Sequence, residues 1–134
     1  MTISKDATVI SDPINGTTDP FAIPGAIIEY VIVITNAGSA TATNISIGDV
    51  LTPELLFETS NLPAGTGNIS VTENGTTTYC TADVADGDGD GCTFDGTDTL
   101  TIQGRDSTAA VQPDPIAVGA NPVTIRFRAQ IDPT

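Results

Sequence analysis

The segment AIIEYVIVIT, residues 26–35, is nearly continuously apolar and rich in β-branched side chains. Such side chains favour an extended backbone, and a short apolar run without alternation is typical of a strand covered on both faces. The segment therefore predicts a central strand of a sheet, with Glu29 as the one residue that does not fit burial on both faces.

A second strand is predicted close to the end of the sequence, at residues 121–132. Over residues 123–131 apolar side chains alternate with polar ones, and the polar positions include Arg126 and Arg128. An alternation with period two indicates a strand with one buried and one solvated face. We therefore expect both arginines on the solvent face of a sheet, near carboxylates.

Shorter strands and frequent turns fill the rest of the chain. Strands are predicted at residues 2–10, 43–50, 55–59, 68–72, 76–82, 99–103 and 108–111. Asn74-Gly75 between two such segments is a strong hairpin signal. No window of a dozen residues has a helical apolar period, and residues 52–56 have room for one helical turn at most. Many short strands with Gly, Pro and Asn turns predict an all-β chain with almost no helix, folded as one antiparallel β-sandwich over residues 1–134.

The charge of the chain excludes several classes of function. There are 17 Asp and Glu against 4 Lys and Arg, the net charge is −13, and His is absent. Four cations cannot offset this field, so neither nucleic acid nor an anionic membrane surface is an expected partner. Without His, a His-based general base and a typical catalytic zinc site are also excluded. No apolar run approaches the roughly 20 residues of a membrane span, so we expect no membrane insertion.

The composition suggests an exported protein. The chain begins MTISKD, which has no basic or apolar leader region, and it is crowded with Thr, Asn, Gly and Asp. We expect a mature extracellular or cell-surface form from which a leader is absent. Potential glycosylation sites of the Asn-x-Ser/Thr type begin at Asn15, Asn44, Asn68 and Asn74.

Residues 24–57 carry a recognisable motif. The stretch PGAIIEYVIVITNAGSATATNISIGDVLTPELLF resembles the core of the bacterial and archaeal "conserved repeat" domain of cell-surface proteins, in its Pro-Gly, its Tyr-centred strand, its Thr-Asn-x-Gly and its final Asp-x-Leu-x-Pro. The resemblance implies an immunoglobulin-like sandwich of the Greek-key type with a structural or adhesive role and no catalytic residues. The chain departs from the family in having one copy and an acidic, cysteine-flanked insertion at residues 80–98.

That insertion is a candidate calcium site. Six of the 17 acids fall within 16 residues, namely Asp83, Asp86, Asp88, Asp90, Asp95 and Asp98. The order Asp86-x-Asp88-x-Asp90-Gly91 matches the first six positions of a calcium loop, in which alternate carboxylates converge on one hard cation. Position twelve is Thr97 rather than Glu, so Asp95 or Asp98 would have to complete the coordination of Ca²⁺. The alternative is an acidic loop that serves only solubility.

Cys80 and Cys92 flank the same segment. A disulfide between them would close a loop of about a dozen residues, which stabilises a fold by about 3 kcal/mol in the chain-entropy model. It would also hold the acidic side chains near one another. The alternative is two free thiols.

These observations favour a non-enzymatic extracellular structural protein. A lone surface domain must be tethered or must polymerise, so we expect a homo-oligomer or filament in which residues 1–10 are donated to the sheet edge of a neighbour. The alternative for these residues is an ordinary first strand of their own domain. The alternative for the function is a monomeric calcium-dependent adhesin that binds a surface glycan or protein ligand. Aromatic residues are scarce, which disfavours a sugar-binding or sugar-hydrolysing platform, and no pair of acids stands out for catalysis.

Overall fold

The computed structural model describes residues 1–43, 45–63, 65–82, 84, 89–103 and 116–134. The described residues form nine strands and no helix. The strands are β1 (Thr2–Ser11), β2 (Ile27–Thr35), β3 (Ser46–Val50), β4 (Leu55–Phe57), β5 (Ile69–Glu73), β6 (Thr76–Cys80), β7 (Cys92–Phe94), β8 (Thr99–Gln103) and β9 (Val123–Ile131). None of the described segments is a helix of the length and apolarity that would cross a membrane.

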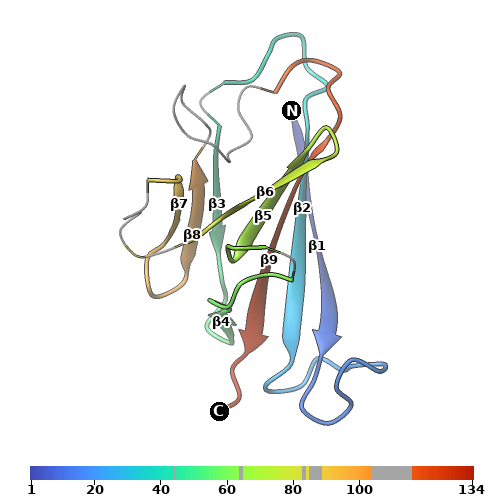
Figure 1. The fold of residues 1–134 in the computed structure, drawn as a ribbon, viewed down its shortest axis with the longest axis vertical. Helices are drawn as coiled ribbons and strands as arrows, with labels where there is room; N and C mark the ends of the chain where they lie inside the picture. Colours follow the sequence, from blue (N-terminus) through green and yellow to red (C-terminus); the bar gives the residue numbers. More distant parts are fainter. Residues whose placement is uncertain (44, 64, 83, 85–88, 104–115) are drawn as a thin grey trace.

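The strands form two antiparallel sheets. The larger has six strands in the order β1-β2-β9-β5-β6, with β4 also paired to β9, and the smaller has the order β3-β8-β7. Figure 1 shows the long strands β1, β2 and β9 side by side, with β3, β8 and β7 as a separate layer. The predicted all-β class with antiparallel sheets is confirmed, and the arrangement is sandwich-like.

One apolar core joins the two sheets. Ile32 and Ile125 of the larger sheet belong to the same buried cluster as Ile47, Leu100 and Ile102 of the smaller one. A fully buried side chain of this size contributes about 1.5–3 kcal/mol relative to an exposed one. Burial of one face of each sheet against the other is therefore the main force that holds the layers together.

The alternation predicted near the end of the chain is confirmed in β9. Val123, Ile125, Phe127 and Ala129 are buried, and the residues between them are only half-buried. The Phe127 ring stacks on Tyr30 of β2 at 5.3 Å between ring centroids. The strand lies between β2 and the pair β4 and β5, which makes it the centre of the larger sheet.

The prediction for β2 is correct in position and wrong in burial. β2 is a central strand between β1 and β9, but only Ile32 and Ile34 are buried, while Val31 and Val33 are half-buried. Among the described strands, those of the smaller sheet cover one face of the larger sheet, so the opposite face of β2 is screened mainly by the side chains of its neighbouring strands. An apolar run in an antiparallel sheet thus does not require two covered faces.

The hairpin between β5 and β6 turns at Asn74-Gly75, as predicted. Asn74 has φ +50° and Gly75 has φ +81°, the pair of positive angles that a two-residue type I′ turn requires. β7 differs from the loop that the sequence predicts for residues 80–98, because these three residues extend only by pairing with β8. The predicted strand at residues 108–111 lies outside the described residues.

Candidate functional site

The two cysteines form the predicted disulfide, and it joins the two sheets. Cys80 ends β6 in the larger sheet and Cys92 begins β7 in the smaller one, with 6.1 Å between their α-carbons. Both residues are almost fully buried and belong to the core cluster. The bridge therefore closes the acidic loop and also links the layers at the point where the chain crosses from one to the other.

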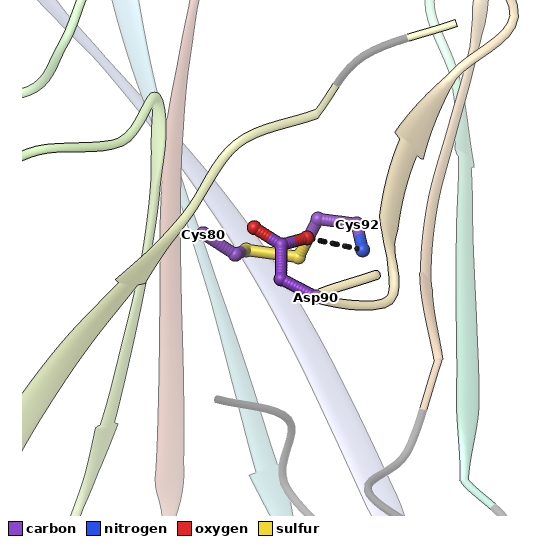
Figure 2. Close-up of side chains that lie close together, drawn as sticks. All are labelled: Cys80, Asp90 and Cys92. Atoms are coloured by element: carbon purple, nitrogen blue, oxygen red, sulfur yellow. Dashed lines mark hydrogen bonds between the residues drawn. A yellow bond between two sulfur atoms is a disulfide. The ribbon is translucent and has the colours of Figure 1, made fainter. Parts of the chain in front are cut away.

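Asp90 lies against this bridge (Figure 2). Its Oδ2 accepts a hydrogen bond from the Thr81 backbone N–H at 2.8 Å, and its Oδ1 accepts one from the Cys92 N–H at 3.0 Å. One carboxylate thus holds the residue after Cys80 and the second cysteine at the same time. An oxygen of Asp90 and the two sulfur atoms lie within 4.8 Å of one another, but the sulfurs are bonded to each other and provide no thiolate for a metal.

Asp95 shapes the turn between β7 and β8. Its Oδ1 accepts hydrogen bonds from the backbone N–H groups of Thr97, Asp98 and Thr99 at 2.8, 2.9 and 3.1 Å. These bonds, the one from Thr99 above all, lower the pKa of the Asp95 carboxyl below its ordinary value. Asp98 accepts a hydrogen bond from the Thr99 hydroxyl at 2.8 Å.

The described acids are therefore divided between two places. Asp90 precedes the three-residue strand β7, and Asp95 and Asp98 follow it. At about 3.3 Å per residue, a strand of this length keeps its two ends on the order of 10 Å apart, whereas two oxygens bound to one Ca²⁺ are at most about 5 Å apart, twice the metal–oxygen distance. The structure does not bring Asp95 or Asp98 to Asp90. The remaining predicted ligands, Asp83, Asp86 and Asp88, lie outside the described residues.

Three buried polar residues hold loops in place, and sequence reasoning did not identify their roles. Asp12, in the loop after β1, accepts hydrogen bonds from the backbone N–H groups of Ile14, Asn15 and Phe21. Asn36 donates to the carbonyls of Ala40 and Ile116 at 2.9 and 2.8 Å.

The third, Asn68, bonds the backbone of Ala82 through both ends of its amide. For Asn36, the sequence feature that could have indicated this role is its place in the turn motif Thr-Asn-x-Gly. Because Asn68 is buried and hydrogen-bonded in this way, its amide is not accessible to glycosylation.

β1 is held by its backbone more than by its side chains. Among the described strands it pairs with β2 alone, in register from Thr2↔Thr35 to Val9↔Ile28. All side chains from residue 2 to residue 8 are exposed, and Ile3 is 63% exposed. The smaller sheet has three strands against six in the larger one, and it leaves most of this edge uncovered.

An open hollow of about 240 Å³ lies where β1 meets the smaller sheet, and Ile3, Ile32, Ile47 and Val50 contribute to its lining. Lys5 crosses it, with Nζ at 2.9 and 2.6 Å from the two carboxylate oxygens of Asp49 on β3. An inward-pointing Lys is a common device for protecting an edge strand from uncontrolled pairing. The ion pair links the edge of one sheet to the edge of the other through side chains.

Comparisons with protein-family models, curated proteins and solved structures found no match. Function is therefore inferred from the geometry of the β1 edge and of the residues around the disulfide.

Proposed function

We propose that this chain is a non-enzymatic, exported structural protein whose copies assemble into filaments by exchanging β1. The observation that carries the proposal is the state of β1, a ten-residue edge strand paired with β2 and exposed on both faces along most of its length. In each filament junction the β1 of one copy occupies the place beside β2 of the next copy.

The exchange costs little because it replaces each contact by an identical one. The ladder between β1 and β2, and the ion pair between Lys5 and Asp49, form equally well within one chain or between two. Such swapping of an identical element is a low-cost route to assembly, and its balance depends on protein concentration. The core loses nothing on transfer, because the side chains of residues 2–8 are exposed in the closed form.

The geometry of the strand suits an open-ended assembly. Ten residues at about 3.3 Å each span roughly 33 Å, enough to cross a neighbouring domain. Residues 12–26 then connect the donated strand to the rest of its own chain. A contact that joins the donor strand of one copy to a different surface on the next is heterologous, and heterologous contacts that do not close form fibres.

The disulfide supports the extracellular, cell-surface part of the proposal. Disulfides persist in oxidising compartments and are rare in reducing ones. By linking β6 to β7, this one holds both layers together while β1 is exchanged. The proposal includes the immunoglobulin-like, Greek-key topology and the kinship with cell-surface repeat domains.

Calcium belongs to the same proposal, with ligands from the run Asp86-x-Asp88-x-Asp90. Asp90 supports it because two backbone N–H groups already fix its carboxylate beside the disulfide. We expect millimolar Ca²⁺ to raise the melting temperature and chelator to reverse the rise. The variant Asp88→Ala should lose most of the shift, whereas Asp95→Asn, at the far end of β7, should keep it. An unchanged melting curve in wild-type protein would refute the site.

Filament formation is tested on the full chain by raising its concentration in Ca²⁺ and following growth by light scattering and negative-stain microscopy. We expect fibres above a threshold concentration. A synthetic peptide of residues 2–11, TISKDATVIS, should slow growth by occupying the free β2 edge at fibre ends, and a scrambled peptide of the same composition should not. Monodisperse particles at every concentration would refute the proposal.

A further inference from the structure

A hollow of about 270 Å³ lies on the outer face of the larger sheet. Its lining includes Arg126 and Arg128 of β9, which alternate along that strand with the buried core residues Ile125 and Phe127. The hollow is thus on the side of the sheet that faces away from the smaller sheet. It is separate from the β1 edge and from the disulfide-closed loop.

The strand registers place its polar side chains in neighbouring rows. Arg128 lies opposite Glu29 of β2, and Arg126 lies opposite Ser70 of β5. Thr72 and Thr77, on β5 and β6, are also opposite each other, and their hydroxyl oxygens are 2.8 Å apart. Four adjacent strands, β2, β9, β5 and β6, therefore supply one continuous polar floor.

The charge of this floor is opposite to that of the whole chain. Among the described residues of the lining, Glu29 is the one carboxylate, and with the two arginines it gives the group a net charge of +1, on a chain of −13. Arg128 donates to Glu29 Oε2 from Nε at 3.1 Å. Arg126 Nε is 3.7 Å from Glu29 Oε1, beyond hydrogen-bond distance, and its side chain is 43% exposed. Arg126 is therefore the guanidinium that Glu29 holds less tightly.

The other residues of the lining form the walls of the hollow, and one of them is aromatic. Leu62 and Pro63, from the segment between β4 and β5, form part of its rim together with Tyr79. The Tyr79 ring packs directly over Gly65, where an added β-carbon would come within 2.1 Å of a ring carbon. This close contact fixes the ring beside the hydroxyl groups of the floor.

We propose that this hollow binds a single sugar ring that carries a carboxylate, such as a uronic acid. A guanidinium pairs with a carboxylate through parallel hydrogen bonds, and Ser and Thr hydroxyls both donate and accept, as sugar hydroxyls require. The hollow is slightly smaller than the roughly 300 Å³ at which pockets for drug-sized ligands begin, which suits a single ring.

Other anionic partners fit the site less well. A peptide strand would bind through backbone groups at a sheet edge, but the hollow is on a face whose strands β2, β9 and β5 are paired on both sides. A nucleic acid carries a dense row of charges that a chain of −13 repels. One carboxylate per ring is a charge that one loosely paired arginine can match.

The test is a titration of the full chain with galacturonate, followed by amide chemical shifts in ¹H–¹⁵N spectra, with galactose as the neutral control. We expect shifts at the residues of the hollow with galacturonate, weaker binding at higher salt, and binding to galactose reduced about tenfold or more because the charge-assisted bonds are lost. Equal binding of the two sugars, or shifts confined to other surfaces, would overturn the proposal.

Two variants with the same loss of charge locate the site. Arg126→Gln should weaken galacturonate binding about tenfold or more, whereas Lys5→Gln, which removes a cation at the β1 edge, should leave it unchanged. Circular dichroism confirms that both variants fold. If Arg126→Gln changes the sedimentation of the protein without sugar and leaves sugar binding intact, the hollow is a contact between copies and the sugar-binding proposal is wrong.

Discussion

Reduction of the disulfide between Cys80 and Cys92 should lower the free energy of unfolding by about 3 kcal/mol. The cysteines are 12 residues apart, and the chain-entropy relation for a loop of that length gives about 9.5 cal/mol/K, which is about 3 kcal/mol at 25 °C. Reduction leaves both sulfur atoms in the core, so it isolates the cross-link from the cavity that a substitution would create. A loss of this size is a large part of the 5–15 kcal/mol that typically stabilises a domain.

The assay is guanidinium unfolding followed by circular dichroism, with and without reductant, after reduction in the unfolded state and refolding. Thiol titration confirms reduction. The slope of the free energy against denaturant should rise on reduction, because the unfolded chain without its cross-link exposes more surface. The double variant Cys80→Ala/Cys92→Ala should lose more than reduction does, since it also removes two buried sulfur atoms. If the unfolding free energies of the reduced and oxidised proteins differ by less than about 1 kcal/mol, the reasoning is refuted, because this difference is well below the loop-entropy value.

Three further predictions concern single residues. Gly67→Ala would place a β-carbon 2.2 Å from the backbone oxygen of Cys80 and should lower the unfolding free energy by about 1–3 kcal/mol, while Gly48→Ala, which meets no atom within 4 Å, should not; urea unfolding measures both. Hydrogen bonds from the backbone, chiefly that of Asn15, lower the pKa of Asp12 from 3.8 to about 2. Folding thus favours the charged form of Asp12, so the contribution of this carboxylate to the free energy of unfolding is complete above pH 3.8 and is lost as the pH falls towards 2. The melting temperature should decline across this range, and Asp12→Asn should reduce the decline. Asn36→Ala should lower the unfolding free energy by about 2 kcal/mol, because the hydrogen bonds that the buried Asn36 amide donates to the Ala40 and Ile116 carbonyls are lost.

The strands that the sequence predicts well are those with one clearly buried face. Residues 99–103 coincide with β8, and the alternation of residues 123–131 coincides with β9, because a side-chain period of two is a local property of the chain. β7 has only three residues and no visible period. It exists because β8 is available to pair with it, and that contact is tertiary. The outer face of β2 is half-buried for a similar reason, since a face is covered only where another layer packs on it, and that is a tertiary property.

The candidate site was predictable only in its chemistry. Two cysteines in a short acidic segment were sufficient to predict the disulfide. That the bridge joins two sheets follows from the pairing of β6 and β7, which no local pattern encodes. Asp90 was predicted as a metal ligand from its spacing, while its two backbone hydrogen bonds depend on the disulfide that brings Thr81 close. The hollow around Arg126 is formed by four strands in register, so it likewise could not be predicted from the sequence.

The central claim, exchange of β1 between copies, is tested most directly by a cysteine pair across the β1–β2 ladder. Ser4 and Val33 are direct partners in the register, so Ser4→Cys/Val33→Cys places two thiols opposite each other. The protein is assembled at high concentration under reducing conditions mild enough to spare the buried bridge, then oxidised and run on a denaturing gel. Exchange predicts a ladder of covalently linked copies, with cross-linked monomer only in dilute samples. Cross-linked monomer alone, from fibres as well as from dilute protein, would contradict the account.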